Sequence, residues 1–201
     1  DLVGSNYYNP NWGYQTVDAN GKQIIRNSRV SNYHQPFTQL TWYWTPNKRT
    51  EFNTSLYYFS GPGSQTSLEW GEAKDPRPDY YKKLPSSAYN VWDATHRVTA
   101  DDYAAWNGLY DTFTGSPEGR QINWDQLYFA NQQANAVGGE ALYYVEERHN
   151  DQMALNLTST YNRTLNRFNR IVGGVALSAT QGMHYKTMSD LLGADTYIDV
   201  D

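Results

Sequence analysis

Apolar and polar residues alternate in two separate parts of the chain, with the period of two that is typical of a β-strand with one apolar face. The stretch LTWYWT places Leu40, Trp42 and Trp44 at alternate positions, and the residues between them are polar or amphipathic. The run 52–58 repeats the pattern after TPNKRT, which contains a proline, an asparagine and two cations. Because such residues end a strand and turn the chain, we expect a hairpin over 31–61.

The same pattern returns about a hundred residues later. MALNLTSTY places Leu155 and Leu157 on one parity and Asn156 and Thr158 on the other. NRTLN is the expected turn, and RIVGGVALSAT is the returning strand. The alternation therefore predicts a second hairpin over 142–185.

The segment 62–141 between the two hairpins has no comparable alternation and is rich in turn-forming residues, as in GPGS, DPRPDYY and SPEG. It contains two expected short helices. In TADDYAAWNGLY, Thr99 is positioned to cap a helix, and Asp102 three residues later completes a pattern like a capping box. INWDQLYFANQQANA has apolar residues at a rough helical spacing and is followed by two glycines.

Short turns thus alternate with long connections, as in a transmembrane β-barrel with short periplasmic turns and long extracellular loops. We expect an all-β chain forming part of a transmembrane antiparallel β-barrel, with about four strands in two hairpins and short helices in long extracellular loops. The expected parts of this single domain, 1–201, are an extracellular loop (1–30), a hairpin (31–61), a long extracellular loop (62–141), a hairpin (142–185) and an extracellular loop (186–201).

Aromatic residues beside the turns fit this interpretation, because amphipathic rings gather at the level of the lipid headgroups. The residues predicted to lie at the membrane interface are Trp42, Tyr43, Trp44 and Tyr58. The polar parity would then face a wet lumen. A soluble β-sandwich also alternates, with one face on a core and the other in water, so periodicity alone leaves that alternative open.

Composition narrows the possible functions. The formal net charge of −5 argues against a nucleic-acid partner, since phosphate binding needs a basic field. The chain has no cysteine, and its four histidines are scattered without a His-x-x-x-His pair. We therefore expect no catalytic centre, no metal site and no cofactor. No apolar run approaches the ~18 residues that a membrane-spanning helix requires.

Six segments distributed along the chain carry a family resemblance: NYYNPNWGYQ, NSRVSNYHQP, SLEWGEAKDPRPDYYKKLPS, QINWDQLYFAN, YYVEERHNDQMALNLTSTYN and GMHYKTMSDLLGADTYIDVD. Together they resemble the barrel region of TonB-dependent outer-membrane receptors of the Bacteroidetes, of the type with a carboxypeptidase-like regulatory domain. The resemblance covers nearly the whole chain. It implies a 22-stranded barrel in the cell outer membrane that binds a nutrient outside the cell and imports it with energy delivered by TonB.

A recognisable plug, a TonB-interacting segment and a final aromatic-terminated strand are absent from the sequence, so we expect an internal slice of the barrel. The implied partners are the remainder of the receptor chain, outer-membrane lipid, TonB through the N-terminal region, and a surface lipoprotein. Four strands alone would leave unpaired edges, which lipid does not tolerate.

Ligand binding is expected in the long loop, where flat aromatic faces lie near hydrogen-bond donors. The candidate residues are Trp70, Arg77, Tyr80, Tyr81 and Trp92. The same aromatic residues could simply pack the loop against its neighbours. Two other functions stay open: a soluble all-β carbohydrate-binding module, and a surface adhesin with the loops as its contact face.

Overall fold

The structure, a computed structural model, describes residues 7–16, 20–91 and 97–198. Its contacts divide the chain into two compact units. The loop unit consists of Asp1–Val30, Thr66–Glu146 and Met188–Asp201, and the strand unit of Ser31–Gln65 and Glu147–Thr187. Among the described residues, no helix is long and apolar enough to cross a membrane.

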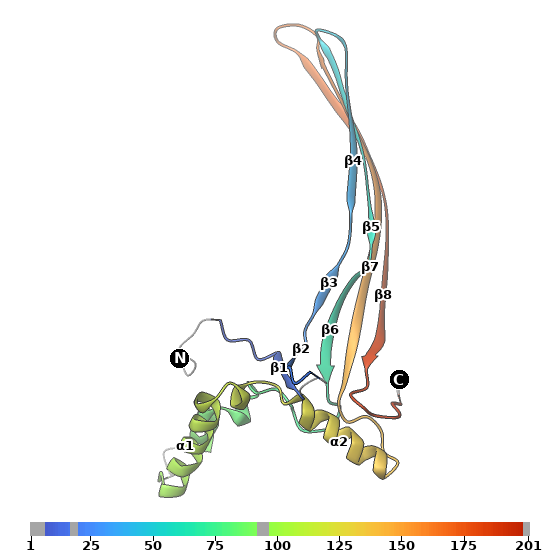
Figure 1. The fold of residues 1–201 in the computed structure, drawn as a ribbon. Coiled ribbons are helices and arrows are strands. Elements are labelled where there is room, and N and C mark those ends of the chain that lie inside the picture. Colours follow the sequence, from blue (N-terminus) through green and yellow to red (C-terminus); the bar gives the residue numbers. More distant parts are fainter. Residues whose placement is uncertain (1–6, 17–19, 92–96, 199–201) are drawn as a thin grey trace. The chain divides into compact units, whose positions relative to one another are not determined.

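The main sheet has six strands and is antiparallel and curled. Its members are β3 (Ser31–Tyr33), β4 (Phe37–Asn47), β5 (Thr50–Gly61), β6 (Gly63–Glu69), β7 (Tyr144–Thr164) and β8 (Arg170–Asp190). Their order is β3, β6, β7, β5, β4, with β8 also paired to β7. Figure 1 shows β4, β5, β7 and β8 running side by side toward two hairpin turns. The mostly β fold and both predicted hairpins, β4 with β5 and β7 with β8, are confirmed; the described residues contain four further short strands.

Strand pairing places the alternating apolar residues of both predicted hairpins on one face of the sheet. Leu40 lies opposite Leu56, and Leu56 lies opposite Leu157, so the three leucines form one row across β4, β5 and β7. Asn53 and Thr160 are paired in the same way on the other face. We call these surfaces the apolar face and the polar face.

The first turn is shorter than the sequence suggests. TPNKRT was expected to end the strand, yet β4 continues through Pro46 to Asn47, which pairs with Thr50. The register shifts between Trp44 and Asn47, which marks a bulge or irregularity. β4 lies at the sheet edge, and edge strands and bulges are where a strand tolerates a proline. Only Lys48 and Arg49 remain as the turn.

The second turn begins later than predicted. NRTLN was expected to reverse the chain, but β7 continues to Thr164 and the turn occupies 165–169. The backbone N–H of Thr164 donates to the carbonyl of Arg49 (2.9 Å), and that of Leu165 to the carbonyl of Asn169 (2.9 Å). Pairing with β5 therefore extends β7 through a polar stretch that shows no alternation of its own.

The range 1–30 was expected to be a loop, but it contains the antiparallel pair β1 (Trp12–Gln15) and β2 (Ile24–Asn27). Strands of four residues are too short for alternation to predict. Gly13 is required by packing, because a Cβ there would lie 1.8 Å from the carbonyl oxygen of Ile122. A main-chain hydrogen bond from Ile122 to Trp12 (3.1 Å) holds this approach.

The helices lie where the sequence predicts them, although α1 is longer than expected. They are α1 (Ala100–Gly115) and α2 (Trp124–Ala136), with the short 3-10 helices η1 (Tyr81–Lys83), η2 (Pro85–Val91) and η3 (Glu118–Arg120). The capping box is confirmed: the Thr99 N–H donates to Asp102 Oδ2 (2.7 Å), and the Asp102 N–H donates to Thr99 Oγ1 (3.3 Å).

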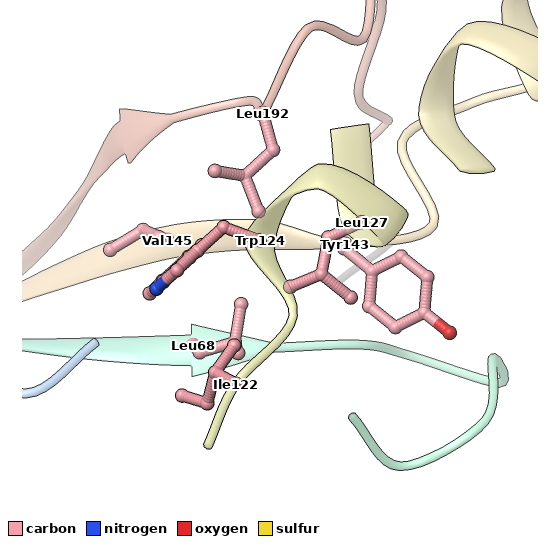
Figure 2. Packing of buried hydrophobic residues seen from close by; sticks show 7 residues of the cluster. All are labelled: Leu68, Ile122, Trp124, Leu127, Tyr143, Val145 and Leu192. Atoms are coloured by element: carbon pink, nitrogen blue, oxygen red, sulfur yellow. The ribbon is translucent and has the colours of Figure 1, made fainter. Parts of the chain in front are cut away.

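The loop unit has a hydrophobic core built around Trp124, which is fully buried. Figure 2 shows the seven side chains of this cluster: Leu68, Ile122, Trp124, Leu127, Tyr143, Val145 and Leu192. They come from β6, the approach to α2, α2 itself, the start of β7 and the segment after β8. In the strand unit, by contrast, Ala154 is the one hydrophobic residue that is buried among the described residues.

Candidate functional site

The predicted ligand loop follows β6, and a turn around two prolines shapes it. The Asp75 carboxylate accepts a hydrogen bond from the backbone N–H of Arg77 (3.0 Å) and two more from its guanidinium, Nε to Oδ1 (3.0 Å) and Nη2 to Oδ2 (2.5 Å). The guanidinium also lies 4.8 Å from the centre of the Trp70 ring. The structure therefore brings Arg77 and Trp70 together, with Asp75 holding the arginine in place.

Trp70 lines two hollows. A cavity of about 210 Å³ is lined by Pro10, Asn11, Ser28, Arg29, Ser67, Leu68, Glu69, Trp70, Arg77 and Asp79. A wider one of about 500 Å³ is lined by Trp70, Ala73, Lys74, Asp75, Tyr80, Lys82 and Lys83. Both belong to the loop unit. The second combines two aromatic rings with three ammonium groups and one carboxylate.

The other candidate ligand-binding residues differ in whether they line this larger hollow. Tyr80 lines the larger hollow, whereas Tyr81 does not. The Tyr81 ring meets that of Tyr80 edge to face (4.8 Å between centres), and Lys82 Nζ lies 5.8 Å from its centre. Trp92 lies outside the described residues. Tyr81 is nevertheless 54% exposed. Among the described candidates, Trp70 and Tyr80 are the two rings that line the larger hollow.

Asp75 and Lys83 in the loop have pKa values shifted from their ordinary ones. Burial opposes ionisation of Asp75, but the hydrogen bonds from Arg77 outweigh burial and hold the pKa of Asp75 below its ordinary value. Burial lowers the pKa of Lys83, with the nearby charge of Asp75 acting in the opposite direction. The hollow therefore has a fixed carboxylate on its wall and an ammonium group that is less well solvated than usual.

The predicted interface aromatics lie in the strand unit. The Trp42 and Trp44 rings stack (5.8 Å between centres, 7° between planes), Trp44 stacks on Phe52 (5.1 Å), and Phe52 contacts Tyr161 (5.0 Å). We call these four residues the aromatic row. It crosses β4, β5 and β7 on the apolar face, close to the turns.

The two remaining interface candidates lie elsewhere. Tyr58 is also on the apolar face, paired with Thr38 and Leu155, at the end away from the turns. Tyr43 is paired with Asn53, so its side chain is on the polar face. Its distance from the turn is as expected, but the alternation of the strand separates it from Trp42 and Trp44.

Contacts at both ends of β8 place its residues on these faces. Tyr185 Oη donates to Asp151 Oδ2 (3.1 Å), which puts the odd-numbered residues of β8 on the apolar face. At the other end of β8, Arg170 Nε donates to Asn162 Oδ1 on the polar face. The even-numbered residues of β8 therefore lie on the polar face, as the alternation requires. Ile171, Val175 and Leu177 thus extend the apolar face, and each is about half exposed or more.

A polar network on the apolar face was missed by the sequence analysis. The His149 and Tyr185 rings stack (4.4 Å between centres), and His149 Nε2 lies 3.0 Å from Thr187 Oγ1. Asp151 Oδ1 accepts from the Gly63 N–H (3.1 Å) and Ser64 Oγ donates to Glu147 Oε1 (2.5 Å). Continuing the alternation of MALNLTSTY backwards through VEERHND would have placed Glu147, His149 and Asp151 on this face.

A second cluster had no detectable sequence signal. Arg26 on β2 forms a salt bridge with Asp190 (2.5 Å), donates to Tyr128 Oη (2.8 Å) and lies 4.6 Å from the centre of the Trp124 ring. The Trp124 Nε1 in turn donates to the Arg26 carbonyl (3.1 Å). These contacts join three distant parts of the chain, so we assign them to structure.

Within 7–16, 20–91 and 97–198, no group of three or more histidine, aspartate or glutamate residues is arranged to hold a metal ion. No protein-family model matches the chain, and a search of curated proteins also finds no match.

Proposed function

We propose that the chain is part of the transmembrane barrel of an outer-membrane TonB-dependent receptor, which binds a nutrient outside the cell and imports it. The observation that carries this proposal is the exposed apolar face of the strand unit. Leu40, Leu56 and Leu157 form a row there and are 69%, 42% and 36% exposed. A large uncovered apolar surface needs a partner, and hydrocarbon is the partner that matches an apolar band lying between polar ends.

The dimensions support lipid as that partner. Ile171 and Met183 on β8 are both exposed and bound a stretch of thirteen residues, in which every position on the apolar face except Gln181 is apolar or glycine. At ~3.3 Å per residue they are about 40 Å apart along the strand. A strand tilted by about 45° reduces this to roughly 28 Å of height, near the ~25 Å apolar band of an outer-membrane barrel.

The polar side chains fit the same arrangement. On the apolar face, Thr54 and Ser159 hydrogen-bond to each other (2.9 Å), which reduces the cost of a hydroxyl in hydrocarbon. On the polar face, Thr41 and Ser55 pair in the same way (3.0 Å) among uncharged polar neighbours. A lumen filled with water accepts such side chains at little cost.

A soluble carbohydrate-binding module would bury one face of its sheet. Ala154 alone does not make such a core in the strand unit, within the part of the chain that the structure describes. The six segments that resemble the Bacteroidetes receptors are a second, independent support. The proposed partners remain the rest of the receptor chain, outer-membrane lipid, TonB and a surface lipoprotein.

The nutrient-binding part of the proposal rests on the hollow beside Trp70. Tyr80 and the ammonium groups of Lys74, Lys82 and Lys83 border it, so a ring could stack on an aromatic face while its polar groups meet a cation. A screen of a deletion strain on single carbon sources would identify the nutrient. Trp70→Ala should then raise the half-saturating nutrient concentration for uptake, while Tyr81→Ala, outside the hollow, should change it much less.

The first test of the membrane assignment is the intact mass of the native polypeptide extracted from outer membranes in detergent, together with a heat-modifiability gel. We expect a chain several-fold longer than 201 residues that migrates faster when unheated. A water-soluble species of about 23 kDa would contradict the proposal and favour a self-contained binding module. A membrane protein whose deletion leaves all uptake unchanged would favour the adhesin.

A further inference from the structure

Positive charge is concentrated at the two hairpin turns of the strand unit. Residues 47–52 and 162–171 contain five cations and one anion, a formal charge of +4; the cations are Lys48, Arg49, Arg163, Arg167 and Arg170, and the anion is Glu51. The whole chain has 16 cations and 21 anions, which leaves eleven against twenty elsewhere, a formal charge of −9. The turns therefore differ in sign from the rest of the protein.

Strand pairing brings the two turns together. Thr50 pairs with Arg163, and the Thr164 N–H donates to the carbonyl of Arg49 (2.9 Å). Glu51 accepts a hydrogen bond from Asn162 (3.1 Å), which also bonds to Arg170, so the one anion is associated with that arginine. Within the described residues, the other four cations form no ion pair. All four are exposed.

The cations adjoin the aromatic row. Tyr161 and Arg163 are two residues apart on β7 and therefore share the apolar face. Beyond them, at the tip of the second turn, Phe168 is 83% exposed and the Arg167 guanidinium lies 5.6 Å from its ring centre. From the strand centre outward, the surface thus changes from aliphatic to aromatic to cationic. A lipid leaflet has the matching layers: acyl chains, the interfacial region and phosphates.

We propose that this turn end binds the phosphate groups of anionic phospholipids in the leaflet that faces the turns. The inference rests on the proposed function, because it needs the apolar face to lie in a bilayer. Four unpaired cations beside an uncovered hydrophobic row match a lipid that carries both a phosphate and acyl chains. An acidic protein would satisfy the charges but would also have to cover the aromatic and leucine rows.

The test uses the intact receptor, purified in detergent and titrated with phosphatidylglycerol or phosphatidylcholine while native mass spectrometry measures the bound lipid. We expect wild type to bind phosphatidylglycerol at least about tenfold more tightly, with a preference that weakens as salt screens the charges. The combined variant Lys48→Gln, Arg49→Gln, Arg163→Gln, Arg167→Gln should lose most of this preference.

Two control variants isolate the effect of charge at this place. Arg163→Lys with Arg167→Lys keeps the charge and should keep the preference. Arg148→Gln with Lys186→Gln removes two cations from the other end of the strand unit and should leave the preference within about twofold of wild type. A heat-modifiability gel on every preparation checks that the barrel has formed.

A correctly formed barrel with equal affinity for both lipids would overturn this inference and leave the proposed function standing. So would a four-residue variant that keeps the full preference. A third outcome would also overturn it: the barrel shows no preference for phosphatidylglycerol, and an acidic protein that co-purifies with wild type is lost from the four-residue variant. The turns would then bind a protein and not lipid. A water-soluble protein with no heat-modifiable form would remove the proposed function itself, and this inference with it.

Discussion

Asn131 is fully buried, and its side-chain amide lies within hydrogen-bond distance of five backbone groups, which makes it a central polar residue of the loop unit. Its two Nδ2 hydrogens are shared among the carbonyls of Tyr143 (2.7 Å), Leu191 (2.8 Å) and Leu192 (3.2 Å). Its Oδ1 accepts from the N–H groups of Leu142 (2.9 Å) and Tyr143 (3.1 Å). One side chain on α2 thus holds the chain before β7 and the chain after β8.

Replacement of Asn131 by leucine should therefore destabilise the loop unit strongly. The volume is retained, but several buried backbone groups lose their partners, at about 1 to 3 kcal/mol each. We expect a loss of about 3 kcal/mol or more, measured by denaturant unfolding or by proteolysis of the loop unit. Asn135→Ala is the control, because Asn135 bonds to Gly193 and Asp195 from a half-buried position on the same helix and should cost under about 1 kcal/mol.

Asp75 gives the predicted ligand loop an expected sensitivity to acid. Its pKa is lower in the folded protein than in an unfolded chain, so its ionisation stabilises the loop above the ordinary aspartate pKa of about 3.9. This stabilisation is lost as the pH falls through the depressed value. Hydrogen exchange of residues 70–83, corrected for the intrinsic effect of pH, should therefore accelerate below about pH 4.

Asp75→Asn is the matching variant, because it removes the charge at every pH. Its loop should exchange faster than wild type at pH 7 and change little further on acidification. Equal pH dependence in wild type and variant would show that another group controls the loop.

At the scale of single elements, the start of α1 is set by its capping box. Thr99→Ala removes the side-chain acceptor of the Asp102 N–H and should destabilise α1 by about 1 kcal/mol. Thr99→Ser keeps the hydroxyl and should cost much less. Exchange of the amides of residues 100–104 measures both effects, and an unchanged rate in the alanine variant would show that packing, not the cap, holds this end.

The two faces of the hairpins make a sharper element-scale prediction. In the receptor barrel proposed above, Leu56→Arg or Leu155→Arg should impair assembly much more than Asn53→Arg or Asn156→Arg. An arginine near the middle of a bilayer costs about 2 to 4 kcal/mol, whereas the lumen of such a barrel is wet. The yield of heat-modifiable protein in outer membranes measures this difference. Similar yields for both pairs would contradict the assignment of the apolar face to lipid.

At the scale of the whole molecule, the main sheet has two open edges. Among the described residues, β4 pairs only with β5, and β8 only with β7. These strands are eleven and twenty-one residues long, and the backbone groups of alternate residues along each open edge have no strand partner; such edges recruit further strands. The isolated 201-residue chain in water should therefore form oligomers at micromolar concentration, visible by light scattering. A stable monomer would indicate that its edges are protected.

The sequence alone predicted the local features of this protein. Alternation predicted the central parts of β4, β5, β7 and β8 and which residues share a face, because a strand places neighbours on opposite sides whatever it pairs with. The pattern around Thr99 predicted the start of α1, because a cap acts within three residues. In the loop after β6, the residue types made Trp70 and Tyr80 candidate ligand contacts; both line the larger hollow, and ligand binding there stays a prediction.

Only the tertiary structure decided the features that depend on distant partners. β1 and β2 are too short to show a period, and each forms because the other lies beside it. The turns lie at 48–49 and 165–169 instead of at the whole of TPNKRT and NRTLN, because strand pairing extends β4 and β7 beyond the residues that favour a strand by themselves. The contacts of Tyr81 with Tyr80 and of Arg77 with Asp75 were decided by the folded loop. Asn131 and Arg26 had no sequence signal, since the groups they bind are brought to them by the fold, and hydrogen bonds of that kind leave no local pattern.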